Sequence, residues 1–314
     1  MKSAKSYGAR RALLVCFFCS AWLAACGGGG GRDPILGIGG NGNGSGSGVN
    51  AIAPVAVVPA SILGSASRFG IFGGSAGMTN TGVNTVITGS SGATADIGTT
   101  ATGTTSITGF HDSAPSDVYT ETGANVGNVT GKIYTCTTST TGPSSATVKA
   151  ASCTVATAAR ADVLTAYNFL VALPAGPNPG AGNLANLTLV PGVYTAAAGS
   201  FKMEGGNLTL DAQGNPDAVW VFQMATTLTV GGPGAAAPQS VILAGGAQSK
   251  NVYWQVGSAA TINAGGGGTM VGTIISQAGT AVSTVGNAAL TAINGRVLSL
   301  GASVTVVNTA ITAP

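Results

Sequence analysis

The feature that most constrains this chain is a series of short β-rich runs between Leu187 and Thr312, each ending at a Gly, Ser or Asn corner. Apolar and small polar residues alternate within the runs, and β-branched residues are enriched, as is typical of strands. Runs this short cannot bury a face alone, so the pattern predicts a mainly β chain that stacks rung on rung into a solenoid. The clearest runs are LTLVPGVYT (Leu187–Thr195), AVWVFQM (Ala218–Met224), NVYWQVGSAATI (Asn251–Ile262) and LTAINGRVLSLGASVTV (Leu290–Val306).

The same alternation of strand-like pieces and glycine corners begins near Ser61, so we expect one solenoid domain over residues 60–314. Glycine supplies the positive φ that tight corners need, which accounts for 51 glycines in the chain. Gln223 and Gln255 fall at equivalent places in two similar runs, which predicts an internal amide ladder. A single amphipathic helix is predicted at about 154–173, ended by Pro174, and we expect it to cover one apolar flank.

Residues 1–25 have the features of an export signal. Four basic residues precede the apolar run Ala12–Leu23, which is too short to span a bilayer comfortably. The end of the run, Leu23-Ala24-Ala25-Cys26, resembles the lipobox of bacterial lipoproteins, which implies cleavage before Cys26 and lipidation of its thiol. An ordinary secretory signal with an unrelated cysteine is the alternative. A lipidated Cys26 would hold the protein at a membrane without a spanning helix.

Two further features indicate where the protein is located. They are the residue that follows the lipobox and the glycine-rich segment beyond it. Gly27 in place of Asp implies sorting to the outer membrane in that class, so we expect a cell-envelope lipoprotein, surface-exposed or released. Residues 26–59 are low in complexity and rich in glycine. They are expected to form a flexible tether with a reach of roughly 30 Å.

Net charge limits the partners. The signal contains four of the 12 basic residues and none of the nine acidic ones, so the mature chain has eight basic against nine acidic residues and is nearly neutral. No basic stripe remains, and we therefore expect no nucleic-acid partner. Membrane contact is expected through the acyl anchor alone, and the protein is expected to be a monomer.

Only two cysteines, Cys136 and Cys153, remain in the part expected to fold. In an oxidising compartment they would most simply form one disulfide across the polar loop between them. Two free, buried thiols are the alternative. A metal site is not expected, because no second pair of ligands accompanies them.

Catalytic groups are sparse. His111 is the only histidine, it lies in a turn-like context beside Asp112, and the carboxylates are scattered along the chain. A solenoid enzyme acting on polysaccharides needs a cleft dense in charged residues, whereas only 7% of this chain is charged. No phosphate-binding glycine loop is present either. We therefore expect a protein that is not an enzyme and binds no cofactor.

Unusual motifs follow one another in order from Ser61 to Thr312. They include ILGSASRFGIFGG, TNTGVNTVITG, LTLVPGVYT, LTLDAQGNPDAVWVFQM, NVYWQVGSAATI and INGRVLS. In these motifs the chain resembles the bacterial and fungal ice-binding protein family built on the DUF3494 domain. The resemblance implies a right-handed, discontinuous β-solenoid of triangular cross-section, with a long helix alongside and interleaved N- and C-terminal coils. The polar segment 110–152 departs from shorter members, and we expect it to form a capping insertion.

The resemblance also implies that one flat face adsorbs to ice. Thr suits such a face because one stiff side chain presents a methyl and a hydroxyl group. Rungs repeat every ~4.8 Å and alternate residues along a strand every ~6.8 Å, which gives a regular grid. The ice motif reported for the family has the form Thr-Ala/Gly-X-Thr/Asn. Similar tetrads make these residues candidates: Thr81 and Asn84, Thr102 and Thr105, Thr122 and Asn125, Thr280 and Ser283, and Thr291.

The sequence therefore leaves two functions of different classes open. The first is an envelope-anchored ice-binding protein, acting as an antifreeze, an inhibitor of ice recrystallisation or an ice adhesin. The second is a cell-surface adhesion or matrix-structural module of the same fold without ice activity. A flat Thr/Ser/Ala/Gly plane free of Lys, Glu and large aromatic residues favours ice, whereas aromatic platforms or charged grooves favour glycan.

Overall fold

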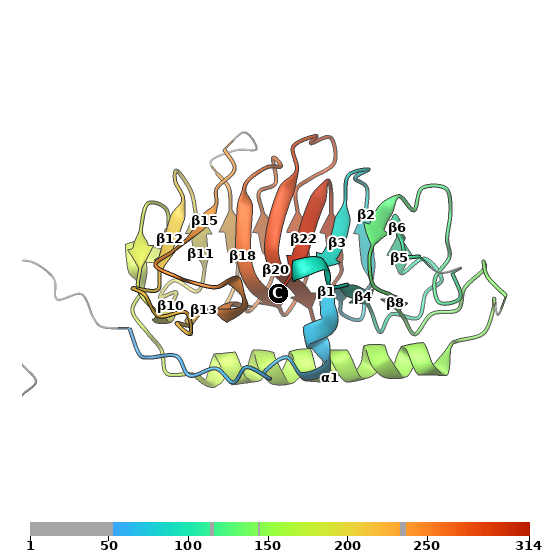
Figure 1. The fold of residues 1–314 in the computed structure, drawn as a ribbon, viewed down its shortest axis with the longest axis horizontal. Helices are drawn as coiled ribbons and strands as arrows, with labels where there is room; N and C mark the ends of the chain where they lie inside the picture. Colours follow the sequence, from blue (N-terminus) through green and yellow to red (C-terminus); the bar gives the residue numbers. More distant parts are fainter. Residues whose placement is uncertain (1–52, 114–115, 144, 233–236) are drawn as a thin grey trace, which may run out of the picture. The chain divides into compact units, whose positions relative to one another are not determined.

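The computed structural model describes residues 53–113, 116–143, 145–232 and 237–314. The expected signal, Cys26 and most of the expected tether lie outside these residues. Within the described residues, parallel strands form three sheets of 12, seven and three strands, and α1 (Ala150–Ala172) lies along one side of them (Figure 1). The mainly β solenoid fold is confirmed.

The seven-stranded sheet contains one short strand from each of seven successive rungs. Its order is β11 (Phe201–Met203), β14 (Leu228–Val230), β17 (Ala260–Ile262), β19 (Thr280–Val282), β21 (Val304–Val306), β2 (Met78–Asn80) and β5 (Ile107–Thr108). The three-stranded sheet has the order β15 (Val241–Ala244), β12 (Leu208–Asp211) and β9 (Thr188–Leu189).

The 12-stranded sheet divides at β20, its longest strand. The first part of β20 pairs with β22, and the last part pairs with β1. The main path is β10 (Gly192–Thr195), β13 (Trp220–Met224), β16 (Val252–Val256), β18 (Thr269–Ser276), β20 (Thr291–Ser299), β22 (Thr309–Ala313), β3 (Val86–Gly89), β7 (Gly127–Val129) and β6 (Phe110–His111). A branch from β20 continues through β1 (Phe69–Gly73), β4 (Asp96–Gly98) and β8 (Ile133–Tyr134). Short 3-10 turns occur at η1 (Gly64–Arg68), η2 (Ser90–Gly92), η3 (Pro179–Gly182) and η4 (Ser249–Asn251).

The N- and C-terminal coils interleave, as the family resemblance implied. β21 lies between β19 and β2, and β22 lies between β20 and β3, so the last rungs of the chain are inserted among the first. Arg296 of β20 links these segments, since its buried guanidinium donates to the carbonyl oxygens of Ser67 (2.9 Å) and Pro314. The solenoid is therefore discontinuous in sequence but continuous in hydrogen bonding.

The core of the first rungs contains a column of aromatic rings. Tyr194, Phe222 and Trp254 occupy the same register position on β10, β13 and β16. The ring centroids of Phe222 and Trp254 lie 4.0 Å apart at an interplanar angle of 8°, and the Trp254 indole N–H donates to the carbonyl of Val271 at 2.8 Å. Because the strands pair in register, aromatic side chains occupy the same position on consecutive rungs.

The helix covers the part of the large sheet formed by β10, β13, β16, β18, β20 and β1, where a second apolar cluster forms. Ala159, Val163, Ala166 and Leu170 are completely buried at helical spacing. α1 starts at Ala150, four residues before the predicted start. It ends at Ala172, because the residue before Pro174 is extended (φ −64°, ψ 147°).

Gln223 and Gln255 are paired in register, as predicted, but their amides do not form a ladder. The Gln223 amide donates to the carbonyl oxygens of Leu170 (2.8 Å) and Leu173 (3.0 Å), which the helix end leaves without internal partners. The Gln255 amide donates to the Tyr167 hydroxyl at 2.9 Å. Both glutamines therefore attach the helix to the sheet.

Part of the expected tether is folded. Ala53 and Ala56 are buried, and the carbonyl of Pro54 accepts a hydrogen bond from the backbone N–H of Val193 (3.0 Å). The segment from Ala53 runs along α1 toward η1 (Figure 1). Residues 53–59 therefore belong to the folded part of the chain, although their composition predicted a flexible tether.

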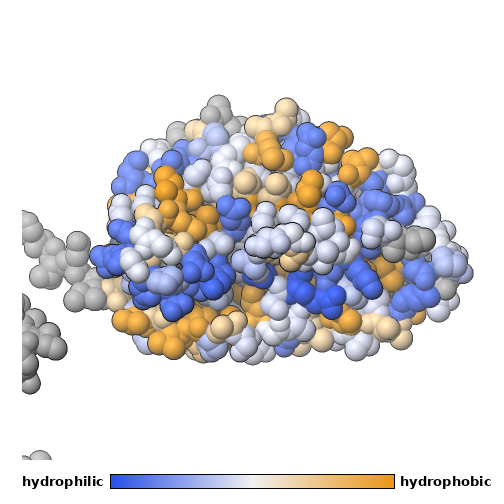
Figure 2. All heavy atoms as spheres, in the orientation of Figure 1, coloured by the Kyte–Doolittle hydropathy of each residue, from blue (hydrophilic) through white to orange (hydrophobic). Residues whose placement is uncertain are grey.

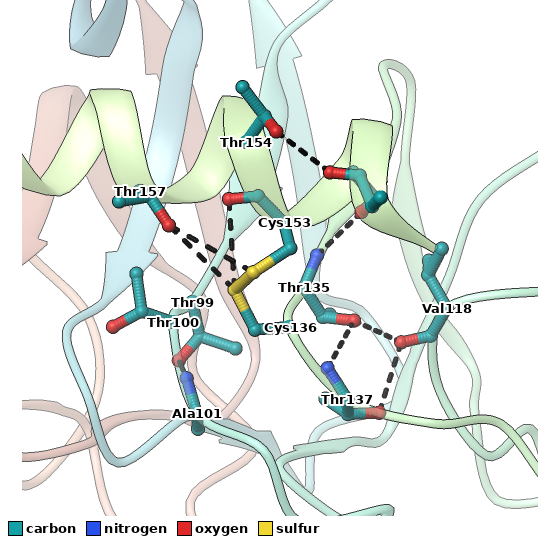
Figure 3. The surroundings of a disulfide bond; sticks show 12 residues. Thr99, Thr100, Ala101, Val118, Thr135, Cys136, Thr137, Cys153, Thr154 and Thr157 are labelled. Atoms are coloured by element: carbon teal, nitrogen blue, oxygen red, sulfur yellow. Dashed lines mark hydrogen bonds between the residues drawn. A yellow bond between two sulfur atoms is a disulfide. The ribbon is translucent and has the colours of Figure 1, made fainter. Parts of the chain in front are cut away.

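Cys136 and Cys153 are joined by a disulfide that attaches the insertion to the first turn of α1 (Figure 3). The backbone N–H of Thr135 donates to the Ser152 hydroxyl at 2.9 Å beside it. The segment expected to be an insertion thus continues the large sheet, because its strands β7 and β8 pair with β3 and β4. We call the described residues between 112 and 149 the cap.

Replacing both cysteines with Ser is expected to lower the free energy of unfolding by about 3 kcal/mol. The bond closes a chain segment with a sequence separation of 17 residues, and its removal restores that loop entropy to the unfolded chain. Urea denaturation of the oxidised protein and of the double variant measures the difference. Equal midpoints would show that the cap is held by its hydrogen bonds alone.

Candidate functional site

The seven-stranded sheet presents one outward residue from each strand, and these residues form a straight row. The flanking residues of each strand are buried and the central one is not, as in Leu228-Thr229-Val230 and Val304-Thr305-Val306. Strand pairing places the central residues side by side. The row, which we call the outer ladder, is Lys202, Thr229, Thr261, Ala281, Thr305, Thr79 and Thr108.

A second row precedes the ladder by two residues on every strand, and all of its residues except the buried Gly77 reach the surface. Backbone hydrogen bonds align these residues rung by rung, for example from Leu228 N–H to the Ala259 carbonyl and from Thr280 N–H to the Ser303 carbonyl. Every residue in it is Ser, Thr, Ala or Gly: Ser200, Thr227, Ala259, Gly279, Ser303, Gly77 and Ser106. Two parallel rows of small side chains, ~6.8 Å apart along each strand and ~4.8 Å apart between rungs, form a grid.

The grid carries one charged side chain, at its first rung. Lys202 forms an ion pair with Glu204, and its side chain is half exposed. From β14 to β5 both rows consist of neutral, small residues. At the far end, the hydroxyl of Thr108 donates to that of Thr79 at 3.0 Å, so adjacent rungs are linked through their side chains.

The surface formed by β20, β22, β3, β7 and β6 is less uniform. One of its outward rows in register is Ala292, Ala310, Val86, Asn128 and His111. The row mixes branched apolar, amide and imidazole side chains, and His111 pairs with Glu121. Figure 2, which views the side carrying α1, β18 and β20, shows hydrophobic and hydrophilic patches interspersed. A second outward row on this surface, Asn294, Thr312 and Thr88, is also hydroxylated in part, but it extends over three rungs. The outer ladder carries Thr or Ala on six consecutive rungs.

Three of the residues proposed from the tetrad motif are inside the protein. Thr280, Ser283 and Thr291 are only 2%, 3% and 0% exposed. Thr280 begins β19 with its side chain inward, where its hydroxyl lies 3.0 Å from that of Ser276, and the outward residue of this strand is Ala281. The prediction that these three form a surface is therefore wrong, because the tetrad is out of phase with strand alternation.

The other six candidates lie at the surface but do not belong to the two rows. Thr81, Thr105, Thr122 and Asn125 meet around a groove of about 320 Å³ at the β5 end of the grid, together with Thr79 and Thr108. Asn84 and Thr102 are exposed in loops away from this groove. A role for these six in binding stays a prediction.

The tetrad motif missed the threonines that form the ladder. Thr229, Thr261 and Thr305 each stand between two buried apolar residues, in the triplets LTV, ATI and VTV. An apolar–Thr–apolar triplet after a small-residue corner is the sequence signal that locates them. Counting outward positions strand by strand would have found the row that a four-residue motif did not.

Other kinds of site are not evident within the part of the chain that the structure describes. It contains no cluster of three or more His, Cys, Asp or Glu side chains placed to hold a metal ion. Among the same residues, no helix is both long enough and apolar enough to cross a bilayer. The hydroxylated grid is therefore the candidate site that we consider.

Comparison with known proteins gives a consistent result. Residues 72–312 match the family described as ice-binding-like. The chain is 44% identical over 102 residues to ice-binding protein 1 of Shewanella frigidimarina, covering 31% of this chain and 10% of that protein. It is 37% identical over 205 residues to an ice-binding protein of Nostoc, covering 65% of this chain and 58% of that one. The chain therefore matches less than two thirds of the length of these relatives.

Solved structures of the same kind share the fold. The ice-binding protein of Antarctomyces psychrotrophicus is 32% identical, with a TM-score of 0.57 over 80% of this chain and 97% of that one. The DUF3494 domain of the Shewanella frigidimarina protein is 26% identical, with a TM-score of 0.59 over 84% and 98%. A glycosylated ice-binding protein from an Arctic yeast is 29% identical, with a TM-score of 0.60 over 80% and 93%.

Proposed function

The chain belongs to the ice-binding-like family, and from that membership we propose that it binds ice through the two outward rows of its seven-stranded sheet. The observation that carries the proposal is the register of the outer ladder. Pairing from β14 to β5 places Thr or Ala at every outward position on six consecutive rungs.

The chemistry of the rows suits a contact with frozen water. Each Thr offers a methyl group, which does not compete for water, and a hydroxyl that can both donate and accept. Its β-branched side chain has few rotamers, so little conformational entropy is lost when an ordered water layer forms on it. Rigid backbone hydrogen bonds fix the spacing of the groups, and such preorganisation lowers the cost of binding.

Charge and aromatic content separate this proposal from an adhesion function. A Lys ammonium is strongly hydrated and would hold its own water shell against a lattice, and only the first rung carries one. Neither row contains an aromatic side chain, whereas a glycan platform would need one. We therefore place ice binding ahead of glycan binding, and we assign no catalytic step to the protein.

Thermal hysteresis and ice recrystallisation in solutions of the purified protein test this function. We expect ice crystals to stop growing within a gap below the melting point and recrystallisation to slow, with serum albumin at equal concentration as the control. If both quantities match the albumin control up to the solubility limit, the chain is a member of the family without ice activity.

We also propose that acylated Cys26 anchors the domain to the cell envelope, with the glycine-rich segment as spacer. The support is the lipobox-like sequence Leu23-Ala24-Ala25-Cys26 and the Gly that follows it. In this arrangement the solenoid would be held at the outer membrane and could bring a cell to ice or limit recrystallisation near it.

Replacing Cys26 with Ser is expected to move the protein from the membrane pellet to the soluble fraction of its cells. The thiol is the acylation site, and a chain without lipid retains no strong membrane anchor. Immunoblots of fractionated cells measure the ratio, with Cys136→Ser as a cysteine control outside the signal. A Cys26→Ser protein that still pellets with membranes would contradict the lipoprotein assignment.

A further inference from the structure

The groove at the β5 end of the grid is formed jointly by the solenoid and the cap. Thr79 and Thr108, the last residues of the outer ladder, line it from the solenoid, and Thr120 and Thr122 line it from the cap. All of its described lining residues are Thr, Asn, Ala or Gly. The groove measures about 320 Å³, which is room for a cluster of several water molecules.

The cap wall repeats a contact found on the ladder. The hydroxyl of Thr140 donates to that of Thr120 at 3.2 Å, as the hydroxyl of Thr108 does to that of Thr79 at 3.0 Å. The backbone N–H of Thr120 donates to the carbonyl of Thr104 at 3.3 Å, which sets this threonine beside the segment leading into β5. Paired threonine hydroxyls therefore occur on both sides of the groove.

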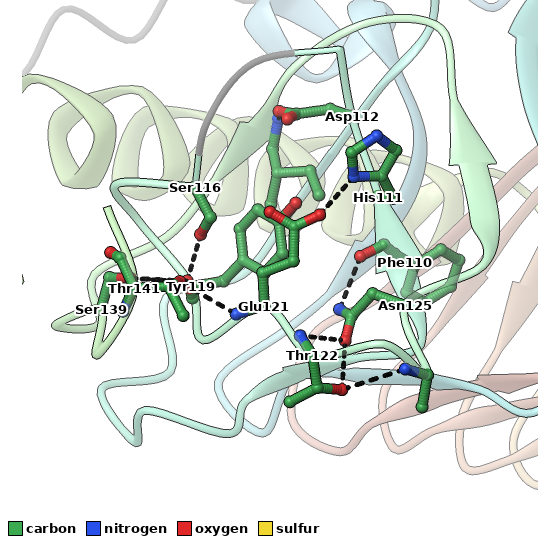
Figure 4. Close-up of polar contacts among 12 residues, drawn as sticks. Phe110, His111, Asp112, Ser116, Tyr119, Glu121, Thr122, Asn125, Ser139 and Thr141 are labelled. Atoms are coloured by element: carbon green, nitrogen blue, oxygen red, sulfur yellow. Dashed lines mark hydrogen bonds and ion pairs between the residues drawn. The ribbon is translucent and has the colours of Figure 1, made fainter. Parts of the chain in front are cut away.

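Side-chain hydrogen bonds fix the backbone of the cap next to the groove. Tyr119 is fully buried, and its carbonyl accepts hydrogen bonds from the hydroxyls of Ser139 (2.7 Å) and Ser116 (Figure 4). Burial, together with the negative charges of Asp112 and Glu121, raises the pKa of the Tyr119 hydroxyl.

The turn at the groove edge is fixed in a similar way. The hydroxyl of Thr122 donates to the Asn125 side-chain oxygen at 2.9 Å, and the Asn125 amide donates to the carbonyl of Phe110 at 2.7 Å (Figure 4). These bonds attach the turn to Phe110, the first residue of β6. The positions of the groove-lining groups are thus determined before any ligand arrives.

We propose that the cap carries part of the ice-contact surface, with the groove holding ordered water that joins the layer over the grid to the threonines of the cap. The proposal rests on the ice-binding function of the grid and assigns a role to the insertion. Two observations support this proposal. The groove begins at the last two residues of the outer ladder, and the groove lining carries no charge. The cap would then enlarge the adsorbing area as well as close the end of the solenoid.

Thr120→Lys and Ala124→Lys test this role, since both residues line the groove and Ala124 is exposed on the turn. A charged, strongly hydrated side chain there should disturb the ordered water. We expect the concentration that halves ice recrystallisation to rise about fivefold for each variant, equivalent to the loss of a modest part of the binding free energy. Thr147→Lys is the matched control, because Thr147 is exposed in the cap but does not line the groove, and its value should stay within about twofold of wild type.

The same assay on Thr305→Lys, in the middle of the sheet, separates the two proposals. If Thr305→Lys loses activity while Thr120→Lys and Ala124→Lys keep the wild-type value, the cap is outside the contact surface and this inference is wrong. If Thr305→Lys keeps its activity as well, the grid itself is not the ice-binding face. Unchanged thermal midpoints show that each variant is folded, and Ala124→Lys decides the question if Thr120→Lys is unstable.

Discussion

Replacing Trp254 with Ala is expected to lower the free energy of unfolding by about 4 kcal/mol, the largest stability effect we foresee for a single residue. The indole is completely buried and stacks on Phe222 with ring centroids 4.0 Å apart. Its removal would leave a cavity between rungs that cannot slide together, because backbone hydrogen bonds on both sides fix their spacing. The carbonyl of Val271 would also lose its donor.

Urea or thermal denaturation of purified variants measures this effect, with Trp254→Phe as the matched control. Phe keeps most of the stack on Phe222 and loses only the indole N–H and part of the volume, so we expect it to cost about half as much or less. A Trp254→Ala protein that unfolds at the wild-type midpoint would show that the aromatic column contributes little to the solenoid.

Replacing Thr305 with Lys is expected to reduce thermal hysteresis by about tenfold or more. Thr305 is exposed in the centre of the outer ladder, between Ala281 and Thr79, so a Lys there interrupts the grid where both halves meet. The hydrated ammonium keeps its own water and holds the surface away from a flat lattice.

Thr165→Lys is the control for this substitution. Thr165 is exposed on α1, so the same change in size and charge occurs away from the seven-stranded sheet. Hysteresis of the control should remain near the wild-type value. If both variants lose hysteresis equally, the added charge has a general effect. If both keep the wild-type hysteresis, the grid is not the ice-binding surface.

Local patterns in the sequence predicted the strands and the helix, because period and corner chemistry act over a few residues. The runs at Ala218–Met224 and Asn251–Ile262 contain β13, β16 and β17, and Pro174 follows the end of α1. The start of α1 was missed by four residues, since Ser152 is fixed there by a bond from Thr135, distant in sequence. Tertiary contacts determine such boundaries.

The binding face was harder to predict than the fold, because strand phase decides which threonines reach water. Thr280 and Thr291 matched a motif and are buried, whereas Thr229 and Thr305 matched none and are exposed. A shift of one residue moves a side chain to the opposite side of a sheet. The row is also assembled from both ends of the domain, with Thr79 beside Thr305, and only the pairing of β2 with β21 reveals that.

Adsorption of the seven-stranded sheet to ice can be measured by the partition of labelled protein into a slowly growing ice crystal. Wild type, Thr165→Lys and a Thr229→Lys/Thr305→Lys double variant would be compared at equal concentration. We expect wild type and Thr165→Lys to be enriched in the ice and the double variant to be left in the liquid. Enrichment of the double variant to the wild-type level, or exclusion of the wild type, would contradict adsorption through this sheet.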